Sequence, residues 1–257
     1  MHGRVVCMPM KKFFFTRLAP LLIVFIFSLQ SGAAIEASEC VVLLHGLART
    51  ERSLLTLERH LRNIGFHVVN VGYPSRKENI QTLALSAIKN ACNQCSNVGA
   101  VKIHFVTHSM GGILVRYYLE HNDIPHLGRV VMLSPPNQGS EAVDIFKDTQ
   151  IFKWLNGPAG QQLGTDDTSL PKTLAAPRYE VGIITGDWTI NPILSLLIPG
   201  KDDGKVSVES AKLEGMKDFL VVPEAHTFIM YDDEVLRQVT FFLQYGKFDR
   251  ESGQANN

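Results

Sequence analysis

The sequence predicts an α/β fold, with a mostly parallel β-sheet and helices on both of its faces. Short runs rich in valine, isoleucine and leucine recur along the chain, and segments with apolar residues at helical spacing lie between them. Glycine or proline ends many of these segments. Strands that alternate with helices favour a parallel sheet. The 257 residues, 45% of them hydrophobic, are enough for one sizeable core.

The first half of the chain alternates strand and helix without interruption. Residues 40–44 form an unbroken apolar run, which is typical of a strand buried on both faces. Residues 51–63 place leucines at helical spacing, and Gly65 then ends the predicted helix. The same patterns predict a strand at 66–71, a helix at 79–91, a strand at 101–106 and a helix at 111–121.

The second half continues the alternation after one irregular segment. A fourth strand is predicted at 129–133, whereas residues 134–177 contain many glycines and prolines and only short helical patterns. We interpret 134–177 as an excursion over the edge of the sheet, a lid or cap, and not as a separate domain. Two strands and a last helix complete one domain that spans residues 35–257, and they are predicted at 179–185, 219–222 and 228–245.

Residues 1–34 have the layout of a secretory signal peptide. A basic region with Lys11, Lys12 and Arg17 precedes an apolar run at 18–29, and small residues follow at 31–34. The alternative is a membrane anchor that is not cleaved, but the apolar run is short for a bilayer span. The sequence therefore predicts an exported protein, periplasmic or secreted.

The charge of the chain excludes one class of partner. The 25 basic and 25 acidic residues balance, and removal of 1–34, with its four basic and no acidic residues, would leave a net charge of −4. A mildly acidic chain without a lysine or arginine cluster gives no reason to expect nucleic acid. The sequence also contains no dinucleotide or phosphate-loop glycine pattern and no paired metal-ligand histidines, so we expect no cofactor and no metal.

Three cysteines remain after residue 34. Cys92 and Cys95 are spaced as in zinc and redox sites, but no second cysteine pair or nearby histidine pair completes a metal site. A redox motif should precede a helix, whereas this pair ends a helical pattern. We expect a disulfide, either between Cys92 and Cys95 or to Cys40, which leaves one thiol unpaired.

Ser109 lies in a turn that suits a catalytic nucleophile. The segment Thr107-His108-Ser109-Met110-Gly111-Gly112 follows a predicted strand and begins a predicted helix, which is the context of a G-x-S-x-G nucleophile elbow. Such a turn exposes the serine Oγ and directs a helix N-terminus at the oxyanion that develops in acyl transfer. Thr107 replaces the first glycine, so the match is incomplete, and a serine that only caps a helix is the alternative.

Three segments together resemble the secreted lipase and esterase branch of the α/β-hydrolase family. Two of them are Val-Val-Leu-Leu-His-Gly-Leu at 41–47 and the elbow at 106–112. The third, Ser-Pro-Pro-Asn-Gln-Gly-Ser at 134–140, is similar to a loop of lipase and GPI-inositol-deacylase-like members. The resemblance implies the α/β-hydrolase fold and a serine hydrolase that cleaves carboxylic esters through an acyl-enzyme on Ser109.

The resemblance also implies an oxyanion hole and a general base. The backbone N–H groups of Leu47, after the His-Gly turn, and of Met110, after the nucleophile, would bind the oxyanion. The base must follow the nucleophile in the order serine, acid, histidine, and His226 is the only histidine after His126. An imidazole titrates near neutral pH and can pass the serine proton to the leaving group.

Asp203 is the acid that the resemblance implies. The segment Asp-Asp-Gly-Lys-Val at 202–206 resembles the Asp-Gly-x-Val segment of related lipases, in which the aspartate before the glycine orients the histidine. A carboxylate there fixes the tautomer of the imidazole and stabilises imidazolium. Asp202 and Asp187 are the alternatives, and a polar turn without function would have the same sequence.

The substrate is expected to be a small-molecule or lipid ester. Residues 188–199 are unusually apolar, and they would either line an acyl pocket or pack in the core. Phe152 and Trp154 are further pocket candidates. The sequence leaves open a transient contact with a membrane or lipid surface, an acyltransferase, thioesterase or amidase activity on the same triad, and a binding protein without catalysis.

Overall fold

The computed structural model describes residues 1–3 and 39–251. The chain divides into the units Met1–Glu36 and Ala37–Asn257, and the fold below is that of the second unit. Apart from its first three residues, the predicted signal peptide at 1–34 lies outside the described residues. Within the described ranges, no helix is both long enough and apolar enough to cross a membrane.

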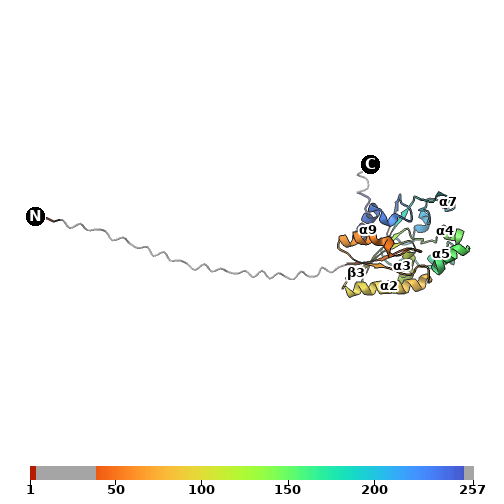
Figure 1. Ribbon diagram of the computed structural model, residues 1–257, viewed down its shortest axis with the longest axis horizontal. Helices are drawn as coiled ribbons and strands as arrows, with labels where there is room; N and C mark the ends of the chain where they lie inside the picture. The colour runs from red at the N-terminus through yellow and green to blue at the C-terminus, as the bar shows by residue number, and fades with distance from the viewer. Residues whose placement is uncertain (4–38, 252–257) are drawn as a thin grey trace. The chain divides into compact units, whose positions relative to one another are not determined.

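A six-stranded sheet forms the centre of this unit (Figure 1). Every neighbouring pair of strands is parallel, and the strand order is β2-β1-β3-β4-β5-β6. All six predicted strands are present, with ends shifted by no more than two residues. The strands are β1 (Glu39–Leu44), β2 (His67–Val71), β3 (Lys102–His108), β4 (Leu127–Leu133), β5 (Val181–Gly186) and β6 (Asp218–Val222).

Helices cover both faces of the sheet, because both faces of the central strands are apolar. Val42 and Leu44 of β1 belong to one core cluster, Val41 and Leu43 to the other, and all four are fully buried. The first cluster includes α2 (Ile80–Asn97) and α3 (Met110–His121), and the second includes α1 (Leu55–Asn63) and α9 (Asp233–Tyr245). Figure 1 shows α2 and α3 on one side of the strands and α9 on the other. The predicted fold class is confirmed.

Two helix ends differ from the prediction. Helix α2 continues beyond residue 91 to Asn97, because Cys95 in its last turns is fully buried against the sheet. The last helix begins at Asp233 and not at 228, because the Asp232 carboxylate accepts a hydrogen bond of 2.8 Å from the Val235 amide and caps the helix there. The preceding residues Ile229–Tyr231 form a short 3-10 turn, η2.

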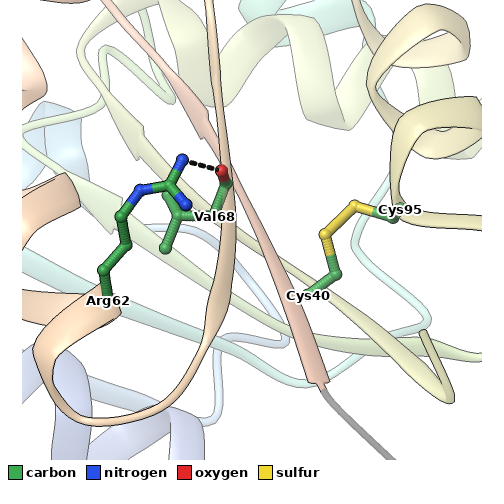
Figure 2. Close-up of a disulfide and its surroundings, with 4 residues drawn as sticks. All are labelled: Cys40, Arg62, Val68 and Cys95. Atoms are coloured by element: carbon green, nitrogen blue, oxygen red, sulfur yellow. Dashed lines mark hydrogen bonds between the residues drawn. A yellow bond between two sulfur atoms is a disulfide. The ribbon is translucent and has the colours of Figure 1, made fainter. Parts of the chain in front are cut away.

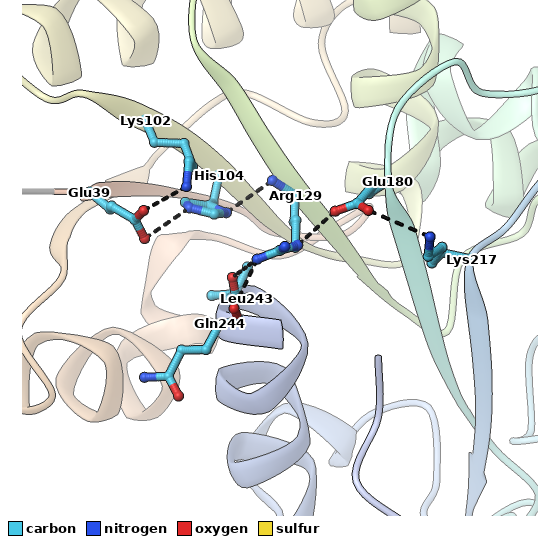
Figure 3. A network of polar contacts seen from close by, with 8 residues as sticks. All are labelled: Glu39, Lys102, His104, Arg129, Glu180, Lys217, Leu243 and Gln244. Carbon is cyan, nitrogen blue, oxygen red and sulfur yellow. Dashed lines mark hydrogen bonds and ion pairs between the residues drawn. The ribbon is translucent and has the colours of Figure 1, made fainter. Parts of the chain in front are cut away.

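A polar network joins strands near the amino-terminal edge of the sheet (Figure 3). Burial lowers the pKa of His104 to about 4, so its ring is neutral, and its Nδ1 accepts the Arg129 amide at 2.9 Å. His104 Nε2 lies 3.3 Å from a Glu39 carboxylate oxygen. The Arg129 guanidinium donates to the carbonyls of Leu243 and Gln244 at the end of α9. His104 thus packs and forms hydrogen bonds near the start of β3, whereas Ser109 follows the end of this strand.

A disulfide joins β1 to α2. Cys40 and Cys95 are bonded with their Cα atoms 5.8 Å apart (Figure 2). Cys92 is free and half-buried. Of the two predicted alternatives, the link to Cys40 is present and the local Cys92–Cys95 pair is wrong, because Cys95 is buried facing β1 while Cys92 is not. Figure 2 also shows Arg62 of α1, which donates to the Val68 carbonyl of β2 at 2.5 Å.

Removal of this disulfide is expected to lower the free energy of unfolding by about 2–4 kcal/mol. The bond closes a loop with a sequence separation of 55, so the unfolded chain would gain considerable freedom without it. Chemical denaturation of Cys40→Ala/Cys95→Ala measures the loss. The matched control is Cys92→Ala in the same helix, expected to change stability by less than about 1 kcal/mol. A double variant no less stable than this control would contradict the prediction.

Candidate functional site

The predicted nucleophile occupies a strained turn between β3 and α3. Ser109 has φ 54° and ψ −125°, in the left-handed half of the map that residues with a side chain rarely adopt. Its amide donates to the Leu133 carbonyl of β4 at 2.8 Å, which holds the turn against the sheet. This conformation, between a strand and a helix, is that of a nucleophile elbow.

Two glycines permit the close approach of backbones around this turn. A Cβ on Gly111 would lie 2.5 Å from the Leu44 carbonyl oxygen, and one on Gly46 would lie 3.0 Å from the Ser109 Cβ. Thr107, the departure from the usual motif, is a regular residue of β3 that pairs with Leu44 and is almost fully buried. A threonine at this position therefore leaves the turn intact.

Ser109, His226 and Asp203 form one hydrogen-bonded chain. The Ser109 Oγ lies 3.1 Å from His226 Nε2, and His226 Nδ1 lies 2.8 Å from an Asp203 carboxylate oxygen. His226 follows β6, and its own amide donates to the Asp203 carbonyl at 2.9 Å. His226 and Asp203 are both buried, so the chain is shielded from water except at the serine end.

The surroundings of Asp203 keep its carboxylate ionised. Burial acts to raise the pKa of Asp203, but the charge and hydrogen bond of His226 outweigh it and hold this pKa below its ordinary value. The second carboxylate oxygen accepts the amides of Lys205 and Val206, at 3.1 and 2.9 Å. A charged acceptor is what an imidazolium beside it requires.

The two alternative acids have other partners. The Asp202 carboxylate accepts the Gly204 amide at 2.7 Å and the Ser195 hydroxyl. The Asp187 carboxylate pairs with the Lys201 ammonium at 2.7 Å. Among the three aspartates, Asp203 alone contacts His226 in the described structure.

The two predicted oxyanion donors lie at the same end of the sheet. Met110 begins α3, so its N–H has no acceptor within the helix. Leu47 follows β1 and lines the cavity beside Ser109. Within the described residues, neither N–H donates to another protein group, and both are therefore free for a substrate oxygen.

Two neutral histidines support this end of the sheet. Burial lowers the pKa of His45, whose ring stacks on Tyr73 with the centroids 4.0 Å apart, and the Tyr73 hydroxyl donates to the His45 carbonyl. Burial first, and then the nearby charge of His226, lowers the pKa of His108 well below its ordinary value. The neutral His108 can therefore donate from Nε2 to the His226 carbonyl, 2.9 Å away, and steady the loop of the base.

A cavity of about 240 Å³ opens at Ser109 and His226. Its apolar wall comes mostly from residues 134–177, which contain α4 (Glu141–Phe146), α5 (Gln150–Gln161) and α6 (Leu170–Thr173). Phe152 lines the cavity, whereas Trp154 is 81% exposed and does not, so Trp154 as a pocket candidate is wrong. Trp154 points away because α5 turns only one side toward the cavity.

Residues 188–199 are mainly on the surface. Leu194, in the short helix α7 (Pro192–Ser195), lines the cavity and Ile198 is buried. The other large apolar side chains of the segment are exposed, namely Trp188, Ile190, Ile193, Leu196 and Leu197. The predicted alternative that the segment packs in the core is therefore wrong for most of it.

Sequence reasoning missed two charged residues of the cavity. Arg49 and Lys205 line it beside Ser109 and His226. No motif marks Arg49. Lys205 occupies the variable position of Asp-Gly-x-Val, so only its closeness to Asp203 in the sequence could have suggested that it lies at the site. In the described part of the chain, no group of three or more histidine, cysteine, aspartate or glutamate side chains could hold a metal ion.

Comparisons with known proteins identify the family and the fold of the chain. The model of the family described as palmitoyl protein thioesterase matches residues 40–173, more than half of the chain. The mature form of lipase BlEst2 from Bacillus licheniformis is similar over 82% of this chain and 93% of its own, with 16% identity and a TM-score of 0.64. No curated protein matches the sequence.

Two further solved structures have the same fold. The metagenomic carboxyl esterase MGS0156 is similar over 76% of this chain and 66% of its own, with 17% identity and a TM-score of 0.59. Lipase B from Aspergillus fumigatus is similar over 81% of this chain and 53% of its own, with 15% identity and a TM-score of 0.60. These similarities confirm the predicted α/β-hydrolase fold.

Proposed function

We propose, because the chain belongs to the palmitoyl protein thioesterase family, that it hydrolyses carboxylic esters through an acyl-enzyme on Ser109. The family and the lipase and esterase structures make it a hydrolase of lipase, esterase or thioesterase type. The observation that carries the finer proposal is the hydrogen-bonded chain from Asp203 through His226 to Ser109, which ends in an apolar cavity.

The mechanism follows from the role of each group. His226 Nε2 takes the proton of Ser109 as Oγ forms a bond to the substrate carbonyl carbon. The N–H groups of Leu47 and Met110 stabilise the negative charge on the carbonyl oxygen. His226 then gives the proton to the leaving oxygen, the acyl–oxygen bond breaks, and water repeats the sequence to release the acid. Asp203 holds the ring and stabilises its positive charge.

Thioester hydrolysis is the second candidate function. The description of the family that matches this chain favours it, and the same groups would serve, with a thiolate as the leaving group. The two candidates differ in the leaving atom and not in the acyl part. A comparison of esters and thioesters with one acyl chain therefore separates them.

Covalent labelling of Ser109 tests the proposed mechanism. A fluorophosphonate probe should add one label per molecule, on the peptide that contains Ser109, because the probe reacts with a serine activated by a neighbouring base. Ester and thioester series of increasing acyl length on the same preparation identify the substrate. Mass spectrometry reads the label. A folded protein that hydrolyses neither series and takes no label would instead be a binding protein.

We also propose that residues 134–177 form a lid and that an apolar rim, shared by this lid and residues 188–199, contacts lipid. The apolar rim consists of the exposed apolar side chains Ile151, Trp154, Trp188, Ile193 and Leu196, each more than half exposed. These side chains lie on or next to α5 and α7, which both contribute residues to the cavity. Exposed apolar side chains that cluster in this way are rare on soluble proteins. The cavity, at 240 Å³, is smaller than the roughly 300–1,000 Å³ of sites that enclose a whole ligand, so a long acyl chain would extend over the rim.

Tryptophan fluorescence tests the contact with lipid directly. Both tryptophans of the chain, Trp154 and Trp188, belong to the apolar rim. Vesicles of phosphatidylcholine are expected to shift their emission to shorter wavelength, because the indoles leave water. Leu196→Ser should weaken vesicle binding several-fold. The matched control is Leu85→Ser, at an exposed leucine of α2 away from the rim; equal binding by the two variants, or no shift, would contradict the proposal.

Export remains a proposal as well. It is supported by the basic, apolar and small-residue layout of 1–34, and by the Cys40–Cys95 disulfide, since disulfides persist in oxidising compartments. N-terminal sequencing of the protein recovered from a bacterial periplasm should give a start at residue 34 or 35. An intact N-terminus in the membrane fraction would favour a retained anchor.

A further inference from the structure

Two cationic side chains stand in the cavity beside the nucleophile. Arg49 and Lys205 line the same cavity as Ser109 and His226. The backbone of each is fixed: the Arg49 amide donates to the Gly46 carbonyl at 3.3 Å, and the Lys205 amide donates to the Asp203 carboxylate at 3.1 Å. The Lys205 carbonyl also accepts the Ser140 hydroxyl at 2.7 Å. Both side chains therefore start from defined points next to the reacting groups.

Neither cation has a counterion in the described structure. Ion pairs involve many of the other lysines and arginines, but no ion pair or side-chain hydrogen bond of Arg49 or Lys205 is present among residues 39–251. No aspartate or glutamate from these residues lines the cavity. The Asp203 carboxylate, whose charge acts on Lys205, is engaged by His226 and two amides.

The two cations also act on each other and on the site. Nearby protein and the charge of Arg49 lower the pKa of Lys205, although the residue is exposed to solvent, and the charge of Asp203 acts in the opposite direction. Both charges likewise contribute to the lowered pKa of His108, after burial and His226. An anion between Arg49 and Lys205 would relieve this repulsion and gain two charge-assisted contacts.

We propose that Arg49 and Lys205 bind a negatively charged group, phosphate or carboxylate, on the leaving alcohol or thiol of the substrate. The inference rests on the proposed function and names its substrate class, an anionic amphiphile. The acyl chain takes the apolar wall formed by Phe146, Phe152 and Leu163, where a charge would be poorly solvated. The anion therefore belongs to the other side of the scissile bond, toward the cations.

A competing explanation assigns the cations to Asp203. In that case Arg49 and Lys205 would only offset the charge of the buried carboxylate. Their loss would then weaken the binding of neutral and anionic substrates equally. The proposal predicts a loss confined to the anionic substrate. The comparison of two ligands that differ only in charge therefore decides between the explanations.

Binding of ether-linked analogues tests the proposal without turnover. Calorimetry on the whole protein compares a short 1-O-alkylglycerol 3-phosphate with the 1-O-alkylglycerol of the same chain, both below their aggregation concentrations. The phosphate analogue should bind about tenfold or more tightly, and Arg49→Gln and Lys205→Gln should each remove about tenfold of that preference. Lys89→Gln, an equal charge change at an exposed lysine of α2, should preserve it.

Several outcomes would overturn the inference. Equal binding of the two analogues by the wild-type protein would do so, as would equal weakening of both in Arg49→Gln and Lys205→Gln with unchanged thermal unfolding. Inorganic phosphate that binds as tightly as the phosphate analogue would indicate a free anion and not a substrate group. A carboxylate analogue of the same chain identifies which anion is preferred.

Kinetics then separate this inference from the proposed function. The ratio of kcat/KM for 1-acylglycerol 3-phosphate to that for 1-acylglycerol should fall about tenfold in each cation variant. If the protein hydrolyses neither substrate but keeps the binding preference, the result contradicts the proposed function and leaves this inference intact. If the protein hydrolyses both substrates with equal kcat/KM and binds both analogues equally, the result contradicts this inference and leaves the proposed function intact.

Discussion

Replacement of Ser109 by alanine is expected to lower kcat by about 10⁶-fold, as loss of the nucleophile does in other serine hydrolases. In the proposed mechanism the serine Oγ is the atom that forms the acyl-enzyme, and it lies 3.1 Å from His226 Nε2. The alanine variant keeps the cavity and the two oxyanion donors, so KM and binding of a non-hydrolysed analogue should change little. Initial rates on the best ester or thioester, with binding measured in parallel, check this prediction.

A matched serine provides the control for this variant. Ser169 is buried in the segment 134–177, and its hydroxyl has no hydrogen-bond partner in the described structure. Ser169→Ala removes the same atom away from the cavity, and its rate should stay within about threefold of the wild type. If Ser109→Ala kept more than about one hundredth of the activity, the acyl-enzyme would have to form on another residue.

Local patterns were sufficient to predict the fold and the turn in which Ser109 lies. The unbroken apolar run at 40–44 predicts a strand buried on both faces, and β1 is buried on both faces because helices cover the sheet from each side. The elbow at Ser109 depends on small residues at 46 and 111, which close backbone contacts require and which the sequence displays. Chain order alone predicts His226 as the base, and its Nε2 lies 3.1 Å from the Ser109 Oγ.

Features that depend on tertiary contacts were less accessible. The cysteine pairing follows from the face of α2 that meets β1, and spacing does not show which of Cys92 and Cys95 lies on that face. The apolar segment 188–199 has a composition typical of a protein core. Whether its leucine and isoleucine side chains are buried depends on which residues pack over them. Arg49 lies in a loop with no motif, and only the folded chain brings it to the same cavity as Lys205.

Asp203→Asn is expected to lower kcat/KM by about 10⁴-fold with little change in the shape of the site, as the corresponding change does in another serine hydrolase. An asparagine amide can hold the ring of His226 in the wrong tautomer and cannot stabilise the imidazolium. The matched controls are Asp202→Asn and Asp187→Asn, the two alternative acids, which have other partners. Each should retain activity within about tenfold of the wild type, and a loss of about 10⁴-fold in either of them instead would move the acid to that residue.

The same variant should change how stability depends on pH. The pKa of Asp203 is lowered in the folded protein, because the charge and hydrogen bond of His226 outweigh the effect of burial. A carboxylate whose pKa is lowered by folding contributes its full stabilisation at pH values above the ordinary aspartate pKa of about 4. That stabilisation is lost as the pH falls through the lower folded value, where the carboxylate takes up a proton. The difference in free energy of unfolding between wild type and Asp203→Asn, measured by denaturation at several pH values, should therefore shrink toward acid pH; a difference independent of pH would mean that the Asp203 carboxylate is not held ionised by His226.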